Sequence, residues 1–149
     1  QWTEADISRA CAATAEAGYD LIEAVIFDPA EARPEATARA LAASGLNGQN
    51  FAFVGYLPQD AAERAQRIRE LEALALRHGQ TQMFIETPYR NAVLLQALLQ
   101  TLQPHTRLST STGLTLDTAR THSMTVKSWK QTAGAAPDNS TPAVFLIGR

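Results

Sequence analysis

The 149-residue chain lacks the signatures of several whole classes of protein. It contains one cysteine, Cys11, which excludes an internal disulfide and a cysteine zinc cluster and favours a reducing compartment, so we expect a cytoplasmic protein. No apolar run approaches the ~20 residues that cross a bilayer, so we expect no membrane partner. The sequence also has no glycine-rich phosphate loop, no Gly-x-Ser-x-Gly and no His-Glu-x-x-His motif, and it therefore carries no strong catalytic signature.

An excess of charge of one sign is also absent. Thirteen Lys and Arg oppose fifteen Asp and Glu, which gives a formal net charge of −2, so bulk charge makes a nucleic-acid partner unlikely. His78, His105 and His122 lie far apart in the sequence, and we expect them to be surface groups rather than ligands of a shared metal. A hydrophobic fraction of 45% in a chain of this length predicts one domain, residues 1–149, with a real core.

What the chain does have is an alternation of short strands and helices. Apolar or β-rich runs bounded by proline or glycine predict strands at 19–27, 51–57, 83–85, 107–112, 120–125 and 143–147. Helical spacing and capping residues predict helices at 4–17, 34–43, 61–78, 91–102 and 126–131. The pattern predicts an α/β fold, a layered sandwich with a mixed five- to six-stranded sheet and helices on both faces.

The sequence also predicts where some of these elements end and which of their side chains face the core. Asp60 should cap the helix 61–78 and Gly79 should end it, while Gly55 permits either a bulge in its strand or the close approach of another backbone. We expect the charged side chains of that helix to form a solvated face, and the hydroxyls of 109–112 to lie on the surface of their strand. Inward-facing positions are predicted at Ile68, Leu71, Leu74 and Ala75, and at Val93, Leu94, Ala97, Leu98 and Leu102.

The stretch 81–102 combines a strand, a polar turn and a helix. Pro88 breaks the apolar run 83–85, and the turn carries Glu86 and Arg90 to the carboxyl end of the strand. Open α/β sheets present their ligand-binding groups at that position. The alternative is that Glu86 and Arg90 pair with each other or cap the following helix.

Five short sequence motifs occur in order in the second part of the chain. They are S-G-L-N-G-Q within 40–49, F-x-F-x-G-Y-L-P at 51–58, E-T-P-Y-R at 86–90, S-x-G-L-T-L at 111–116 and P-A-V-F-L at 142–146. With them, residues 39–149 resemble the C-terminal domain of tetrapyrrole-methylase-type (class III) S-adenosylmethionine-dependent methyltransferases, in the branch that contains small-subunit rRNA ribose methyltransferases. The resemblance covers about three-quarters of the chain.

This resemblance implies a cofactor site but no complete enzyme. In such enzymes the domain packs against an N-terminal Rossmann-like half, and the cofactor lies in the cleft between them. The resemblance places these cofactor-binding residues along the cleft: Glu86, Pro88, Arg90, Ser111, Gly113 and Leu114. It implies no catalytic residue and no metal ligand in this chain.

The first 38 residues depart from the methyltransferase pattern, because the motifs of the N-terminal half are missing from them. Residues 2–29 instead resemble a helix–strand–helix unit of sugar-phosphate isomerase and epimerase TIM barrels, and the likeness continues to about Leu46. We therefore interpret the domain as an engineered chimera, in which 1–45 are of barrel type and 46–149 are of methyltransferase type. A natural truncation or fusion is the competing origin, and because the chain begins at Gln1 we expect an upstream piece or tag to have been removed.

Three functions follow from these likenesses. The first is a folding module without catalytic activity, with no cofactor expected, at most weak S-adenosylmethionine binding, and self-association through apolar surface that a missing domain leaves exposed. The alternative is half of an rRNA 2′-O-ribose methyltransferase that retains cofactor binding and needs the missing N-terminal domain. Sugar isomerisation is the weakest, because one helix–strand–helix unit cannot build a barrel.

Overall fold

The computed structural model describes residues 34–114 and 117–149. The predicted helix 4–17, the predicted strand 19–27, Cys11 and nearly all of the barrel-like segment lie outside the described residues. In the remainder, each predicted strand and helix is present, with ends that differ by a few residues at most. Among the residues that the structure describes, no helix combines the length and the apolar character needed to cross a bilayer.

The described chain contains five strands and five helical segments. The strands are β1 (Phe51–Tyr56), β2 (Thr81–Glu86), β3 (Arg107–Thr112), β4 (Arg120–Thr125) and β5 (Ala143–Gly148). The helices are α2 (Pro34–Ser44), α3 (Ala61–His78), the short 3₁₀ helix η1 (Pro88–Arg90), α4 (Asn91–Thr101) and α5 (Val126–Trp129).

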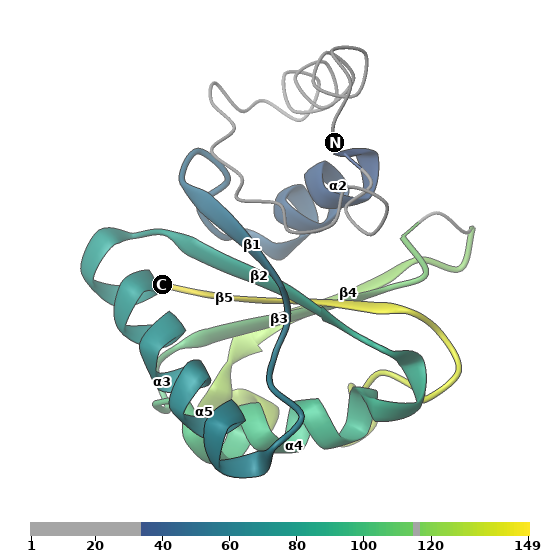
Figure 1. Ribbon diagram of the computed structural model, residues 1–149. Coiled ribbons are helices and arrows are strands. Elements are labelled where there is room, and N and C mark those ends of the chain that lie inside the picture. The colour runs from purple at the N-terminus through teal and green to yellow at the C-terminus, as the bar shows by residue number, and fades with distance from the viewer. Residues whose placement is uncertain (1–33, 115–116) are drawn as a thin grey trace.

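The strands form one sheet in the order β1-β2-β5-β3-β4. β1 and β2 are parallel, because α3 connects them, and every other neighbouring pair is antiparallel. Figure 1 shows α3, α4 and α5 below the sheet and α2 above it. This arrangement confirms the predicted layered fold with a mixed sheet and helices on both faces.

Each face of the sheet carries its own hydrophobic core, because alternate residues of a strand point to opposite faces. On the α3/α4 face, the rings of Phe84 and Phe145 stack with centroids 6.0 Å apart, and Ile68 and Leu98 pack against the same cluster. On the α2 face, a smaller cluster gathers Ala40, Leu41, Leu46, Phe51, Phe53, Met83 and Leu146. The sheet therefore separates two cores of different size.

The local signals at α3 and β1 are confirmed. The Asp60 carboxylate accepts hydrogen bonds from the amides of Ala62 and Glu63, at 2.9 and 3.0 Å, and caps the start of α3. Gly79 ends the helix in the left-handed conformation, with φ of 64°. Gly55 also has a positive φ, 70°, and the β1–β2 register shifts beside it, as expected of a bulge.

The predictions that Val93 and Leu74 face inward are wrong. Val93 is 48% exposed and Leu74 is 39% exposed. On α4 the buried stripe runs through Leu94, Leu95 and Leu98, and a neighbouring residue is turned by about 100° from it. The same rotation removes Leu74 from the buried stripe of α3.

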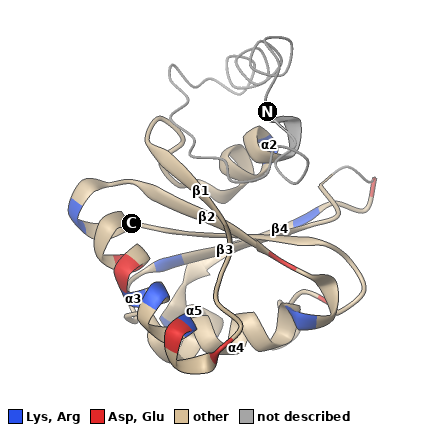
Figure 2. Cartoon of the chain, in the orientation of Figure 1, with Lys and Arg blue, Asp and Glu red and all other residues tan. Residues whose placement is uncertain are grey.

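The expectation of a fully solvated charged face on α3 is wrong at two positions. Figure 2 shows basic and acidic positions alternating along this helix, but Arg64 is only 7% exposed and Glu72 only 4%. Arg64 donates from Nη1 to the carbonyl of Gln59 at 2.8 Å, and so ties the helix to the preceding turn. Both charges are buried with specific partners, as buried charges must be.

The expectation that the hydroxyls of β3 lie on its surface is also wrong. Ser109, Thr110 and Ser111 are buried, because β3 is an interior strand between β5 and β4. A polar sequence therefore occupies a central position in the sheet. Its small side chains fit there because Ser111 pairs with Thr121 of β4, at 2.9 Å between their hydroxyl oxygens.

Candidate functional site

The turn after β2 carries a partly buried ion pair. Arg90 Nε lies 3.3 Å from Glu86 Oε2, and the two side chains are 19% and 7% exposed. Glu86 Oε1 also accepts hydrogen bonds from the amide and the hydroxyl of Thr87, at 2.8 and 3.1 Å. Pro88 occupies the first position of η1, where its missing amide hydrogen costs nothing. The alternative that Glu86 and Arg90 pair with each other is therefore confirmed.

The pair is close but incompletely hydrogen-bonded. Arg90 Nε is buried and has no hydrogen-bond partner among the described residues, because its geometry toward the carboxylate satisfies the distance of an ion pair without the alignment of a hydrogen bond. Arg90 can thus orient Glu86 electrostatically and keep part of its donor capacity. The Arg90 guanidinium is therefore the main hydrogen-bond donor among the side chains of this turn.

The second predicted segment is the turn that follows β3. Gly113 has a φ of 59°, which an L side chain rarely adopts, and its amide donates to the carbonyl of Pro142 at 3.3 Å. The carbonyl of Leu114 accepts a hydrogen bond from Arg39 Nη1 of α2 at 3.1 Å. The side chain of Leu114 packs against the core on the α2 face. Glycine is required here by the backbone conformation.

The sheet register brings the two predicted segments to the same end of the sheet. Ala143, the first residue of β5, pairs with Glu86 on one side and with Thr112 on the other. Two strand spacings place Glu86 and Thr112 about 9.5 Å apart. Both turns therefore leave the sheet from adjacent positions, although about 25 residues separate them in sequence.

The side chains at this end divide between the two faces of the sheet. Glu86 lies opposite Ala143 and shares the α3/α4 face with it, whereas Ser111 lies opposite Val144 and shares the α2 face. The Ser111 hydroxyl is buried and engaged by Thr121. What the two segments offer together at the sheet end is mainly backbone and the Arg90 guanidinium.

Residues 138–142, called here the strap, connect the two turns. Asn91, the first residue of α4 and fully buried, donates from Nδ2 to the carbonyls of Asp138 and Thr141, at 2.8 and 2.9 Å. The next carbonyl, that of Pro142, accepts from Gly113. The sequence analysis predicts no helix or strand between 131 and 143, and it misses Asn91 because the partners of this residue lie 47 and 50 positions away.

The carboxylate of Asp138 holds the strap in shape. It accepts hydrogen bonds from the Ser140 hydroxyl and amide at 2.6 and 2.7 Å, and from the Thr141 amide at 2.7 Å. These donors, the Ser140 hydroxyl first, lower the pKa of Asp138 to about 2. Asp138 is therefore ionised at neutral pH, and its charge organises the strap rather than serving as a base.

Apolar side chains are exposed near the carboxyl ends of β1 and β2. Tyr89 of η1 is 69% exposed, and Tyr56 and Val93 are about half exposed. Tyr56 is the last residue of β1 and pairs with Ile85, next to the Glu86 turn. These exposed side chains lie beside the candidate site, and the self-association expected through apolar surface stays a prediction. What covers this surface in solution stays a prediction.

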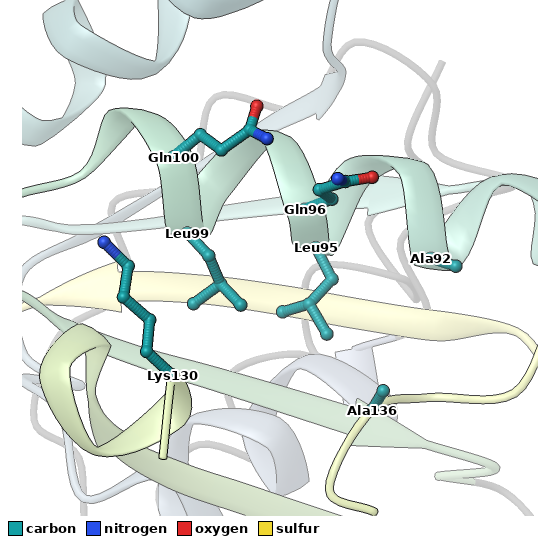
Figure 3. Close-up of a pocket in the computed structure, with 7 residues that line it drawn as sticks. All are labelled: Ala92, Leu95, Gln96, Leu99, Gln100, Lys130 and Ala136. Atoms are coloured by element: carbon teal, nitrogen blue, oxygen red, sulfur yellow. The ribbon is translucent and has the colours of Figure 1, made fainter. Parts of the chain in front are cut away.

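A shallow groove of about 260 Å³ lies elsewhere, along the outer side of α4 (Figure 3). Leu95 and Leu99 form its floor, Gln96 and Gln100 its rim, and Lys130 and Ala136 its opposite wall. None of the six predicted cofactor-binding residues lines it. Its volume is below the range of about 300–1,000 Å³ typical of pockets for small ligands. Within 34–114 and 117–149, no three His, Cys, Asp or Glu side chains group as a metal site.

Comparisons with known proteins support the methyltransferase resemblance over part of the chain. No protein-family model matches. Over 69 residues, 46% of this chain, the sequence is 38% identical to the ribosomal RNA small subunit methyltransferase I of Mesorhizobium japonicum. That match spans only 22% of the relative's length.

Among solved structures, the methyltransferase CobJ overlaps 74% of this chain and 46% of its own, with a TM-score of 0.48 and 17% identity. At that score and identity we draw nothing from the overlap. Neither comparison supports the barrel likeness of the first residues or the interpretation as a chimera, and both stay predictions.

Proposed function

We propose that this chain is part of a tetrapyrrole-methylase-type, S-adenosylmethionine-dependent methyltransferase that acts on a ribose hydroxyl of small-subunit rRNA. The observation that carries the proposal is the 38% identity over 69 residues to a ribosomal RNA small subunit methyltransferase. The match spans 22% of the relative, and the proposal includes the N-terminal domain of such methyltransferases as the other half of the enzyme. This is the alternative of the sequence analysis, and the match supports it better than a folding module.

In this proposal the chain supplies one wall of the cofactor cleft. The cofactor brings the activated methyl group, and the residues of this chain bind and orient it. The turn at Gly113 and Leu114 offers backbone groups, and Arg90 offers a partly exposed guanidinium that Glu86 holds in place. The strap holds both turns at fixed positions through Asn91 and the carbonyl of Pro142. Fixed positioning of this kind is what transfer between two bound molecules requires.

The hydrogen-bonding side chains at this end of the sheet are enough for one wall of a cofactor site but not for a whole site. The Ser111 hydroxyl is engaged by Thr121, and the Glu86 carboxylate is engaged by Thr87 and Arg90. Few side-chain groups at this sheet end are therefore free to hold a charged and polar cofactor. The chain alone should bind it weakly, and tight binding should need the second half.

Calorimetry with S-adenosylhomocysteine tests the proposal. We expect millimolar or weaker binding to the full chain alone, and micromolar binding once the N-terminal half of the Mesorhizobium relative is added. The pair should also transfer a labelled methyl group from S-adenosylmethionine to small-subunit rRNA. Millimolar or weaker binding in both samples, with no transfer, would refute the proposal and leave the folding module.

A matched pair of glycine variants links binding to the proposed turn. Gly113→Ala and Gly134→Ala both place a side chain at positive φ, 59° and 81°, at a cost of about 1 kcal/mol each. Gly134 lies in the 133–141 loop, with open space where a Cβ would stand. We expect only Gly113→Ala to weaken binding of S-adenosylhomocysteine to the pair of halves. Equal weakening by both variants would argue that the turn has no part in the site.

A further inference from the structure

The small net charge of the whole chain conceals an uneven distribution along the sequence. Residues 1–86 carry thirteen Asp and Glu against seven Arg and Lys, whereas residues 87–137 carry five Arg and Lys against one acidic residue, Asp117. A net charge that averages over two such parts describes the surface of neither. The basic part includes β3 and β4, at one edge of the sheet, and α5, which packs beside β4.

Three exposed cations lie along this edge and are called here the basic track: Arg120, Lys127 and Lys130. Arg120 begins β4 and shares a face of the sheet with His122, whose ring lies edge-on to Trp129 of α5, with centroids 6.3 Å apart. Lys127 and Lys130 are three residues apart in the turn of α5, so they are neighbours on its surface. β4 spans about 17 Å, and the track therefore extends over that length and the adjoining helix.

Little acidic charge opposes the basic track. β3, β4 and α5 contain no Asp or Glu, and Figure 2 shows basic positions without acidic ones on the two strands. Glu72 of α3 approaches the loop before β3, but it is only 4% exposed and is engaged by the amide of Gln103 and the hydroxyl of Thr106. Asp117 lies in the turn that precedes Arg120. The positive potential of the track is therefore largely uncompensated and favours an anionic partner.

The surroundings of the track fit a nucleic acid better than a membrane or an apolar partner. Contact with a membrane surface needs apolar side chains beside the cations. The large apolar side chains that are exposed in the described residues all lie outside β3, β4 and α5; they are Tyr56, Leu74, Tyr89 and Val93. Around the cations, residues 118–132 offer mainly Ser, Thr and Gln, which contact phosphate and sugar oxygens in nucleic-acid complexes.

We propose that the basic track binds the phosphate backbone of the rRNA substrate and directs the strand toward the cofactor site. Arg120 lies opposite Thr112, the residue before Gly113 in the turn proposed to face the cofactor. An RNA strand that follows β4 from α5 therefore reaches the end of the sheet where the methyl group is held. The choice of rRNA as the anion rests on the proposed function, whereas the charge of the track does not.

Fluorescence anisotropy with a short, labelled single-stranded RNA tests the track on the full chain. Three phosphate contacts to a single strand predict a slope of about −2 when the logarithm of the association constant is plotted against that of the salt concentration. Arg120→Gln, Lys127→Gln and Lys130→Gln should each reduce this slope by about 0.7 and weaken binding about fivefold at about 0.1 M salt. The triple variant should weaken binding about a hundredfold.

Arg69→Gln is the matched control, because it removes the same charge from an exposed position of α3, beside Glu70. It should leave RNA binding unchanged. Circular dichroism should show all four single variants folded, since each changes an exposed side chain. No RNA binding, or equal weakening by Arg69→Gln and the track variants, would overturn the proposal. A polyglutamate peptide that binds as tightly as the RNA, with the same losses, would assign the track to an acidic protein instead.

RNA binding is measured without the cofactor or the N-terminal half, so the track and the proposed function can fail separately. If the two halves together transfer methyl groups but the triple track variant leaves the KM for rRNA unchanged, the track is wrong and the function stands. If the track variants weaken RNA binding but the two halves transfer no methyl group, the track stands and the proposed function is wrong.

Discussion

Replacing Glu72 by alanine should destabilise the fold much more than the same change at Glu70 on the same helix. The Glu72 carboxylate is buried, and its Oε1 accepts hydrogen bonds from the amide of Gln103 at 2.8 Å and from the hydroxyl of Thr106 at 2.5 Å. These bonds hold the connection between α4 and β3 against α3. Glu70 is half exposed and pairs with Arg67 at 3.2 Å.

The expected magnitudes follow from those contacts. A hydrogen bond to a charged group contributes about 1.5–3 kcal/mol, and the alanine variant leaves the buried Thr106 hydroxyl without a partner. Relief from burying a charge offsets part of this loss, so we expect Glu72→Ala to lower the free energy of unfolding by about 3 kcal/mol. An exposed ion pair contributes about 0–1 kcal/mol, so Glu70→Ala should cost at most about 0.5 kcal/mol.

Urea unfolding of the full chain, followed by circular dichroism, compares the two variants directly. Both substitutions remove one carboxylate from the same helix and have the same helix propensity, so their difference isolates the buried contacts. Free energies of unfolding that agree within about 0.5 kcal/mol would refute the reasoning. That result would mean that Glu72 is solvated in solution and does not hold the α4–β3 connection.

Two further predictions concern the strap and the hydroxyls of β3. Because the folded pKa of Asp138 is about 2, below its ordinary value of 3.8, its contribution to stability is present above about pH 4 and is lost as the pH falls toward 2. Asp138→Asn should therefore reduce the loss of stability between pH 4 and pH 2, and an unchanged acid unfolding curve would contradict this. Ser109 has a buried hydroxyl with no partner in the described residues, so Ser109→Ala should be neutral or raise the free energy of unfolding by up to about 1 kcal/mol. Ser111→Ala should lower the free energy of unfolding by about 1 kcal/mol, because Thr121 then loses its hydrogen-bond partner. If chemical unfolding shows Ser109→Ala to be less stable than Ser111→Ala, both predictions are contradicted.

The parts of the fold that the sequence predicts are those set by local chemistry. Asp60 and Gly79 fix the ends of α3 through contacts within three residues, and Gly55 marks its bulge by conformational freedom alone. Glu72 shows the limit of this approach. Its partners lie 31 and 34 residues away, so its burial depends on how α3 meets the α4–β3 connection and is invisible in the helical pattern.

The candidate site divides in the same way. The pairing of Glu86 with Arg90 is an i, i+4 contact, and the sequence offers it as one of two alternatives. The approach of that turn to Gly113 depends on β5, which inserts between β2 and β3 although it is the last strand in the chain. No local signal carries that information, and the same holds for the contacts of Asn91 with the strap.

The position of β5 also determines when the candidate site can exist. Without this strand, β1 and β2 on one side and β3 and β4 on the other share no strand-to-strand hydrogen bonds. Ala143, the first residue of β5, pairs with both Glu86 and Thr112, and the strap that precedes it joins the two turns. Because pairing between distant segments is slow and costs loop entropy, closure by β5 belongs late in folding. The site at this sheet end is therefore assembled by the step that unites the sheet, and no shorter N-terminal piece of the chain would contain it.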